Sequence, residues 1–348
     1  MLDEAALAAS PAMKAVEIPQ FGLDHLRINE VAEPARGPRL VRVAVRAVSL
    51  NYRDYLVVKG SYNPKLVLPF VPGSDMAGEV LEVSPGVTRW KPGDRVMGCF
   101  MPAWQDGPYL DSYAKSALGG AVPGVLAEQV SLPDDALVAV PDNFSFEEAS
   151  TLPCAGVTAW NALVAQGSIK AGDTVLLQGT GGVSIFALQI ARLRGARVII
   201  TSSSDEKLAR AQSLGADAGI NYRTTREWDK RARELTAGRG VDHVVEVGGA
   251  GTFERSLNAV RGGGRISYIG VLAGIKGEIN MAWVFHKHLT VQGIYVGSRA
   301  MFEDLARALT QGNARPVIDR VFPLAEIAAA LRHMEAGAHF GKIVVRVS

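Results

Sequence analysis

The chain has 348 residues, of which 48% are hydrophobic and 21% are charged. A chain of this length and composition can bury a large core and is expected to form two domains, so disordered and fibrous classes are excluded. The formal net charge is only +2, which gives no general attraction to nucleic acid or anionic lipid. An anionic ligand must therefore be held by local contacts.

The 2 cysteines, Cys99 and Cys154, exclude a disulfide framework and any metal site of three or four thiolates. They fit a reducing cytoplasm. No window reaches the roughly 18 uninterrupted apolar residues of a membrane span. Asp3 and Glu4 stand where a secretory signal needs Lys or Arg. We expect a cytoplasmic protein with neither nucleic acid nor membrane as a partner, in which residues 1–12 form a loose extension.

The first part of the chain, from Lys14 to about Asp142, consists of short alternating apolar and polar runs. Examples are residues 40–45 and 77–83, and Pro-Gly turns separate such runs. Alternation with a period of two is typical of strands with one buried face. This part is predicted to be an antiparallel β domain.

After Asn143 the pattern changes to buried apolar strands separated by helical segments of about a dozen residues, which indicates βαβ units around a parallel sheet. The helix after Ser204 has clear ends, because Ser204 is a preferred N-cap and Gly215 follows the last helical residue. Six strands suit a doubly wound sheet. The strands are predicted at Thr174–Gln178, Arg197–Thr201, Gly219–Asn221, His243–Val247, Arg265–Val271 and Leu289–Tyr295.

A glycine-rich turn follows the first of these strands and opens a helix predicted over Val183–Arg194. Small residues there let the backbone approach a pyrophosphate, and the N–H groups at the helix N-terminus face it. Ser184 replaces the third glycine of the usual fingerprint. The turn could serve packing alone, but its place in a series of parallel strands favours dinucleotide binding. Its predicted cofactor contacts are Gly179, Thr180, Gly181, Gly182 and Val183.

The end of the next strand predicts which dinucleotide binds. NAD-specific folds of this type place an acid there to accept the ribose 2′-OH, whereas this chain has Ser202 and Ser203, with Lys207 one helical turn further on. Hydroxyl donors and a lysine favour a 2′-phosphate, and hence NADP(H). In the alternative interpretation, Ser204 is only a cap and Lys207 is a solvated helix residue.

The chain resembles the medium-chain dehydrogenase/reductase superfamily over nearly its whole length, because several motifs occur in the order and spacing of that family. These motifs are residues 51–54 (Asn-Tyr-Arg-Asp), 72–78, 91–96, 154–160, the glycine-rich turn and 341–344. The resemblance implies an α/β protein with a GroES-like β domain and a Rossmann domain with a six-stranded parallel sheet. The implied boundaries are 1–155 for the first part of the catalytic domain, 156–295 for the Rossmann domain and 296–348 for the return, with the substrate in the cleft between the domains.

The resemblance also concerns zinc. The alcohol dehydrogenases of this family bind a catalytic zinc through residues at the places of Asn51, Ser74 with Asp75, and Cys154. Only Cys154 keeps the ligand type of those enzymes. One thiol with a neutral amide and a hydroxyl does not make the site that Zn²⁺ requires. Arg53 stands where the zinc enzymes have the hydroxyl that relays the alcohol proton, so the resemblance implies that this route is missing too. We therefore expect no metal.

What remains resembles the zinc-independent quinone oxidoreductases and enoyl reductases, and homologues of this kind are also named zinc-type alcohol dehydrogenase-like proteins. The resemblance implies hydride transfer from NADPH to an apolar quinone or α,β-unsaturated carbonyl. Tyr62 matches the proposed proton donor, although it could equally be a wall of the substrate site. Asn51 and Asp54 match polar residues of the catalytic cleft.

Further cofactor contacts follow by position in the family. Tyr222 resembles a tyrosine on the 2′-phosphate side of the adenosine. The other positions lie near the phosphates, the nicotinamide or the closing Gly-Lys motif: Thr158, Gly270, Val271, Tyr295, Val296 and Lys342.

Three further expectations complete the interpretation. His286 and His288, two residues apart before a strand, should point to opposite faces and lie at a surface or subunit interface rather than bind metal. The charged run 223–239 is read as a solvated helix face. Leu289–Tyr295 could pair with a second copy across a two-fold axis, which predicts a homodimer. Two rival functions stay open: an NAD(P)-dependent alcohol dehydrogenase or carbonyl reductase, and a non-enzymatic NADPH-binding structural or sensing protein.

Overall fold

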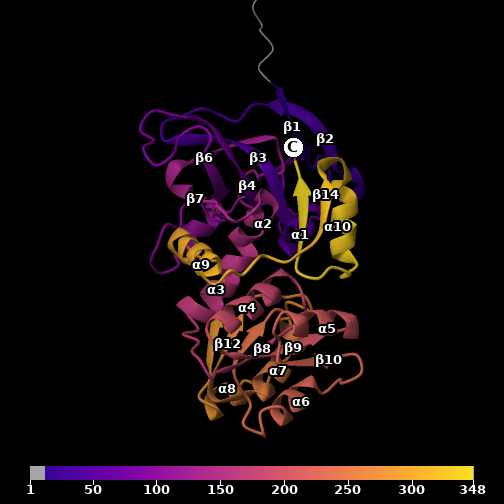
Figure 1. The fold of residues 1–348 in the computed structure, drawn as a ribbon. Helices are drawn as coiled ribbons and strands as arrows, with labels where there is room; N and C mark the ends of the chain where they lie inside the picture. Colours follow the sequence, from indigo (N-terminus) through magenta and orange to yellow (C-terminus); the bar gives the residue numbers. More distant parts are fainter. Residues whose placement is uncertain (1–11, 348) are drawn as a thin grey trace, which may run out of the picture. The chain divides into compact units, whose positions relative to one another are not determined.

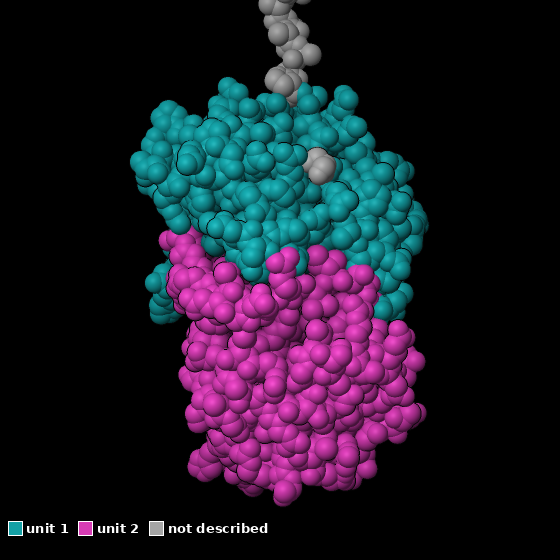
Figure 2. Space-filling model, in the orientation of Figure 1, with its two compact units in different colours: residues 1–153, 320–338, 343–348 teal, residues 154–319, 339–342 magenta. Residues whose placement is uncertain are grey.

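The computed structural model describes residues 12–347, which form two compact units. Unit 1 comprises the chain up to Pro153 together with Arg320–Ala338 and the end of the chain from Ile343; unit 2 comprises Cys154–Asp319 and His339–Lys342 (Figure 2). The expectation for residues 1–12 lies almost entirely outside the described residues.

Unit 1 is built on an antiparallel sheet with the strand order β14-β15-β3-β4-β5-β7, in which β6 also pairs with β3. A separate antiparallel pair joins β1 to β2. This is the antiparallel β domain that the alternating runs and turns predicted, and the GroES-like architecture that the resemblance implied. The strands are β1 (Ala12–Glu17), β2 (Arg27–Ala32), β3 (Leu40–Leu50), β4 (Asp75–Val83), β5 (Arg95–Gly98), β6 (Gln129–Pro133), β7 (Leu137–Ala139), β14 (Ile318–Pro323) and β15 (Lys342–Arg346).

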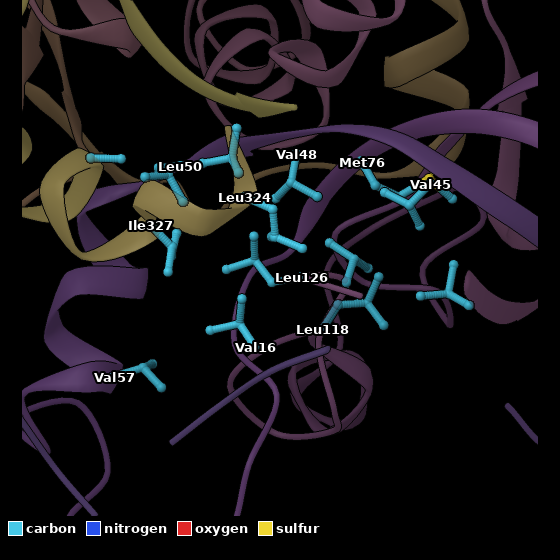
Figure 3. Packing of buried hydrophobic residues seen from close by; sticks show 14 of the residues in the cluster. Val16, Val45, Val48, Leu50, Val57, Met76, Leu118, Leu126, Leu324 and Ile327 are labelled. Atoms are coloured by element: carbon cyan, nitrogen blue, oxygen red, sulfur yellow. The ribbon is translucent and has the colours of Figure 1, made fainter. Parts of the chain in front are cut away.

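The long strand β3 organises the core of unit 1. Its alternating valines Val41, Val43 and Val45 are fully buried, as expected for a strand with one face on the core. Because β3 pairs with β6 near its start and with β15 near its end, it joins both ends of the chain into one sheet. Figure 3 shows side chains from distant segments, such as Val48 and Leu324, meeting in this core.

Helix α1 (Tyr52–Val58) follows β3 directly and carries the Asn-Tyr-Arg-Asp segment. Asp54 Oδ2 accepts a hydrogen bond from the backbone N–H of Asn51 at 2.8 Å, which fixes the first turn. The outer face of α1 contacts α10, where the hydroxyl of Tyr55 donates to Glu335. The other α-helices of unit 1 are α2 (Phe146–Ser150) and α10 (Ile327–Glu335).

Unit 2 contains a six-stranded parallel sheet with the order β10-β9-β8-β11-β12-β13 (Figure 1). All six strands expected from the sequence are present, and the prediction of a Rossmann-like sheet is confirmed. The largest difference is at the start of β12, five residues earlier than predicted, because the glycines 262–264 continue the strand. The strands are β8 (Thr174–Leu177), β9 (Arg197–Ser202), β10 (Ala218–Asn221), β11 (Val241–Glu246), β12 (Val260–Tyr268) and β13 (Thr290–Gly293).

Helices cover the strands of unit 2: α4 and α5 contact β8–β10, and α6 and α7 contact β10–β12 and each other. Ser204 is the N-cap of α5, and its hydroxyl accepts from the N–H of Lys207, as predicted. The helices are α3 (Val157–Trp160), α4 (Gly182–Leu193), α5 (Asp205–Ser213), α6 (Trp228–Glu234), α7 (Ala250–Ala259), α8 (Ala282–His286) and α9 (Arg299–Gln311).

Two sequence expectations differ from the structure. The chain returns to unit 1 at Arg320 rather than at residue 296, because α9 packs on α3 within unit 2. His286 and His288 are exposed, but they do not alternate along an extended segment: His286 ends α8, and His288 lies in a turn with φ of 51°. Among the described residues, no helix is long and apolar enough to cross a membrane.

Candidate functional site

The strand order of unit 2 reverses between β8 and β11, and the carboxyl ends of these strands form the topological switch point where doubly wound sheets bind ligands. The glycine-rich turn follows β8 there. At its start, the N–H of Gly179 donates to Thr201 Oγ1 at 3.1 Å, which ties the turn to the end of β9. Gly181 is the N-cap residue of α4. All predicted cofactor residues belong to unit 2.

A buried polar network fixes the position of the glycine-rich turn. Glu246, at the end of β11, is fully buried, and its Oε2 accepts from Gln178 Nε2 at 2.6 Å and from the hydroxyl of Ser256. Its Oε1 accepts from the N–H groups of Gly248 and Gly249. Gln178 immediately precedes the turn, and its carbonyl accepts from Ser184 Oγ at 2.6 Å. The serine in place of the third glycine therefore anchors α4 to the turn.

The C-terminal Gly-Lys segment packs against the other side of the turn. The N–H of Gly341 donates to the carbonyl of Thr180 at 2.9 Å. A Cβ on Gly182 would lie 2.5 Å from Lys342 Cδ and 3.2 Å from Ala155 Cβ. Gly182 thus has to be glycine because Lys342, which is 4% exposed, lies directly on it.

The ends of β12 and β13 bring the expected nicotinamide residues to the same edge of the sheet. Gly270 and Val271 follow β12 and pack on Gly249, whose Cβ would lie 2.8 Å from Val271 Cα. Val296, just beyond β13, has φ of 57°, an outlier for a β-branched residue that is found mostly at functional turns. Asn161 Nδ2 holds this conformation by donating to the Val296 carbonyl at 2.8 Å.

Thr158 lies one helical turn before Asn161 on α3 and is buried. Segments of π-helix, 152–156 and 161–165, flank α3 on both sides; such segments are rare and concentrate at functional sites. Gly297 fits against Val157 of α3, because its Cβ would lie 2.7 Å from Val157 Cγ1. The turn that carries Tyr295 and Val296 is therefore packed on the helix that carries Thr158.

The residues predicted for the 2′-phosphate gather where β9 and β10 end. Ser202 lies opposite Asn221 in the parallel pairing, and the N–H of Tyr222 donates to the Ser202 carbonyl at 3.0 Å. Lys207, in the first turns of α5, has its pKa lowered by partial burial, which Asp319 and Glu206 partly counteract. The Tyr222 ring is exposed. Asp205, next to this group, is held by Asn221 Nδ2 at 2.7 Å.

The site fits a dinucleotide. A Cβ on Gly179 or Gly181 would meet no atom within 4 Å, so the turn is bordered by open space on the side where the first N–H groups of α4 have no helical acceptor. A pyrophosphate could be held by Gly179–Val183, an adenosine 2′-substituent by Ser202, Ser203, Lys207 and Tyr222, and a nicotinamide near Thr158, Gly270, Val271, Tyr295, Val296 and Lys342.

A second polar cluster lies in unit 1. Asn51 Nδ2 donates to Ser74 Oγ at 3.3 Å, and Ser74 Oγ donates to Asp75 Oδ1 at 2.7 Å. All three side chains are buried. Asp54 is also buried and receives the N–H of Asn51, so Asn51 and Asp54 fix the junction of β3 and α1.

This cluster does not fit a catalytic zinc. It contains an amide, a hydroxyl and one carboxylate, and these groups already hydrogen-bond each other, whereas Zn²⁺ in catalytic sites takes three nitrogen, thiolate or carboxylate ligands. Across residues 12–347, no group of three or more His, Cys, Asp and Glu side chains has the geometry to hold a metal ion.

Tyr62 and Arg53 lie close together beside this cluster. The guanidinium Cζ of Arg53 is 6.0 Å from the Tyr62 ring centroid and 4.2 Å from that of Phe100. Tyr109 is a further aromatic neighbour: its pKa is raised first by partial burial and then by Asp111 and Tyr62. These side chains form an aromatic surface around one buried positive charge.

The other tyrosines of α1 have different surroundings. The hydroxyl of Tyr55 donates to Glu335 Oε1 at 2.5 Å, and this hydrogen bond, followed by burial, raises its pKa to about 12. Tyr52 packs on Tyr55, with ring centroids 5.5 Å apart. The hydroxyl of Tyr55 is thus bound to α10.

Sequence reasoning missed several of these residues. Gln178, Glu246 and Asn161 do not lie in the motifs used, although a glutamine directly before the turn and an acid at the end of an apolar strand are visible signals of buried polar groups. Arg53 was interpreted only as a lost hydroxyl, and Phe100 and Tyr109 carry no sequence signal.

A parallel switch-point sheet with this turn, combined with a GroES-like β unit, defines an NAD(P)-dependent oxidoreductase. Two family models match, "Zinc-binding dehydrogenase" over residues 182–311 and "Alcohol dehydrogenase GroES-like domain" over residues 37–142. The chain therefore belongs to the medium-chain dehydrogenase/reductase superfamily.

The relatives carry both alcohol and quinone names. A zinc-type alcohol dehydrogenase-like protein of Schizosaccharomyces pombe is 42% identical over 94% of this chain and 96% of its own length. The quinone oxidoreductase of Sus scrofa is 30% identical over 91% and 92% of the two chains. A solved structure named NAD-dependent alcohol dehydrogenase is 38% identical and has a TM-score of 0.89, covering 97% of this chain and all of that one.

The open space at Gly181 allows a direct test of the cofactor site. Gly181 has φ −79° and ψ −177°, which any residue adopts, so we expect Gly181→Ala to change the free energy of unfolding by less than about 0.5 kcal/mol. Its methyl group would enter the space for the pyrophosphate, so NADPH affinity should fall about tenfold or more in fluorescence titration, equivalent to about 1.4 kcal/mol.

Gly262→Ala is the matched control, because Gly262 is exposed in β12 and a Cβ there would meet only the carbonyl oxygen of Lys287, at 3.8 Å. We expect this variant to keep parental NADPH affinity. Parental NADPH affinity in the Gly181→Ala protein would show that the turn does not bind the pyrophosphate.

Proposed function

We propose that the protein is a zinc-independent, NADPH-dependent reductase of quinones or α,β-unsaturated carbonyl compounds. The observation that carries this proposal is a contrast between the two units. Unit 2 has a complete dinucleotide turn with open space, whereas the polar cluster Asn51, Ser74 and Asp75 in unit 1 has the wrong donors for zinc.

The reduction of a simple aldehyde or ketone and the reduction of a conjugated acceptor require different groups in the active site. A simple carbonyl needs a Lewis acid or a strong proton donor, because charge develops directly on oxygen. A conjugated acceptor is already electrophilic at carbon and needs only hydrogen-bond donors at its oxygen. The side chains of unit 1 supply donors rather than metal ligands, which supports the second type of substrate.

Bound NADPH would supply the hydride from its nicotinamide ring. In unit 1, Tyr62 would donate a proton or hydrogen bond to the reduced acceptor. We propose that Asn51 and Asp54 act by fixing the first turn of α1. The aromatic rings of Phe100 and Tyr109 suit an apolar acceptor.

The choice of NADPH rests on the group where β9 and β10 end. Ser202 and Ser203 provide hydroxyl groups, and Lys207 provides a partly buried positive charge that suits a charge-assisted contact with a phosphate. The 2 cysteines, neither of which forms a disulfide in the described part of the chain, suit a reducing compartment such as the cytoplasm.

We also propose a homodimer that forms through β13. This strand ends the six-stranded sheet, and no other strand of residues 12–347 pairs with its outer edge. Around the edge, Val291, Phe285 and Tyr295 are exposed. An open edge with apolar side chains is suited to pairing with the same strand of a second copy.

Two alternative functions are distinguished from this proposal by the same experiment. The names of the relatives favour reversible oxidation of a primary or secondary alcohol. The second is a non-enzymatic NADPH-binding role. These alternatives differ in what happens to bound NADPH when acceptors are added.

The function is tested by stopped-flow oxidation of bound NADPH with a panel of quinones, enones, aldehydes and ketones. Protein treated with chelator and analysed for zinc should oxidise NADPH with quinones or enones and only slowly with simple carbonyls. Activity confined to alcohols and simple carbonyls, together with about one zinc per chain that is needed for it, would support the alcohol dehydrogenase instead. No oxidation with any acceptor would leave the sensing role.

The cofactor choice is tested with Lys207→Ala. Removing one charge-assisted contact of about 1.5–3 kcal/mol should weaken NADPH binding about ten- to a hundredfold and leave NADH binding nearly unchanged. Lys230→Ala, which removes a lysine paired with Glu227 on the surface of the same unit, should leave both affinities unchanged. A parental protein that prefers NADH, or a Lys207→Ala protein that loses both nucleotides equally, contradicts the assignment.

The proton donor is tested with Tyr62→Phe, which keeps the ring and removes the hydroxyl. We expect kcat for enones to fall about 10²-fold with NADPH affinity intact. Quinones should be less sensitive, since they can take protons from water. Tyr55→Phe is the matched control, because its hydroxyl is bound to Glu335, and it should retain parental turnover. Tyr52→Phe tests the third tyrosine in the same way. Full enone turnover by Tyr62→Phe would reduce Tyr62 to a wall residue.

A further inference from the structure

The guanidinium group of Arg53 has an unusual position in unit 1. Its side chain is only 10% exposed and lies on the ring of Phe100. Nη2 donates to the carbonyl of Leu118 at 2.5 Å and lies 3.4 Å from Asp54 Oδ1. One edge of the guanidinium is therefore fully bound to protein.

The other edge is buried without a protein partner. Nε and Nη1 are inaccessible, and no acceptor among residues 12–347 receives a hydrogen bond from either. Buried donors of a charged group are nearly always satisfied, because an unsatisfied one retains its full desolvation cost. Arginine stays protonated at every relevant pH, so the unused donors indicate an absent acceptor.

Gly120 borders the unused edge of the guanidinium. A Cβ at this buried glycine would lie 3.2 Å from Nη1 of Arg53 and 3.4 Å from Cε1 of Tyr62. Gly120 is not among the glycines with positive φ, so its backbone does not require glycine. The missing side chain instead leaves one atom-sized position unoccupied between the guanidinium and the ring that carries the proposed proton donor.

We propose that Arg53 binds the carbonyl oxygen of the acceptor through its unused donors and stabilises the negative charge that this oxygen gains. This inference rests on the proposed function and identifies the substrate class as conjugated carbonyl compounds. Hydride adds to the β-carbon as the C–H bond of the dihydronicotinamide breaks. The electrons of the C=C bond then form the enolate, and the carbonyl oxygen carries its charge.

Tyr62 or water then protonates the α-carbon, which completes the addition of a hydride, which carries both electrons, and a proton. The cofactor is oxidised and the acceptor is reduced. Arg53 transfers no atom; it acts on the oxygen where charge develops, as oxyanion-binding donors do in other enzymes.

Asp54 argues for a neutral carbonyl rather than a permanent carboxylate. Its buried carboxylate lies 3.4 Å from Nη2 of Arg53 and balances the positive charge in the ground state. A substrate carboxylate would add a second negative charge beside Asp54. A carbonyl oxygen becomes negative only during the reaction, so its binding to Arg53 strengthens at that point.

Three variants test the inference with enones that lack a carboxylate. Arg53→Ala should lower kcat about 10²- to 10³-fold with NADPH affinity intact. Added guanidinium chloride at a concentration below that which denatures the protein should restore part of kcat. Arg53→Lys keeps the charge but loses the planar pair of donors, so kcat should fall about tenfold or more. Arg36→Ala, which changes an exposed arginine of the same unit, is the control and should show parental kinetics with no guanidinium effect.

Gly120→Ala keeps the test decisive if Arg53→Ala does not fold. Its methyl group would occupy the space beside Nη1 without touching the bound edge of the guanidinium, so KM for enones should rise about tenfold or more with NADPH affinity unchanged. Parental enone kinetics in Gly120→Ala and Arg53→Lys together would overturn the inference.

Two further outcomes separate the inference from the proposed function. If Arg53→Ala raises KM only for carboxylate-bearing acceptors and leaves kcat for neutral enones unchanged, Arg53 binds a substrate carboxylate and the inference is wrong, although the proposed function stands. If the parental protein reduces quinones but no enone, the inference is wrong and the proposed function stands; if it reduces neither, the proposed function fails as well. Guanidinium rescue of kcat, which a merely structural role would not show, supports the inference.

Discussion

The buried carboxylate of Glu246 is the interaction on which the rest of unit 2 depends. It sits at the end of a central parallel strand, fully excluded from water, where an unpaired charge would cost several kcal/mol. Backbone N–H groups of Gly248 and Gly249, the hydroxyls of Thr252 and Ser256 and the amide of Gln178 all donate to it. Gln178 directly follows β8, the two glycines lie in the turn after β11, and the two hydroxyl groups belong to α7. The carboxylate of Glu246 therefore holds these three segments together.

This arrangement determines what the dinucleotide site is made of. Gln178 is held by Glu246, and its carbonyl accepts a hydrogen bond from Ser184. These bonds fix the glycine-rich turn on its buried side, whereas a Cβ on Gly179 or Gly181 would meet only open space on the other side. The turn can then offer backbone N–H groups and the positive end of α4 to a phosphate. Such a site needs little net charge, which agrees with a chain whose formal charge is only +2.

The parts of this structure that follow local rules could be predicted. The strand β3 alternates residue by residue, α5 begins at a serine cap, and the glycine-rich turn joins a strand to a helix, so neighbouring residues are enough to recognise each of them. The pairing of Gln178 with Glu246 could not be predicted, because the two residues are 68 positions apart and meet only through the strand order. The early start of β12 was missed for a related reason: its glycines indicate a turn locally, and only the pairing of Val260 with Val241 and of Arg265 with His243 on either side places them in a bulge within the strand.

The two side chains that we place beside the acceptor have opposite environments, and their proposed roles require this. A proton donor must recover its proton from water after each turnover, and Tyr62 is 41% exposed. A group that stabilises developing charge is most effective where water does not screen it, and Arg53 is buried beneath the same space. Gly120 keeps that space open between them, so the absence of a side chain at this position is as necessary to the proposed chemistry as the two groups that border it.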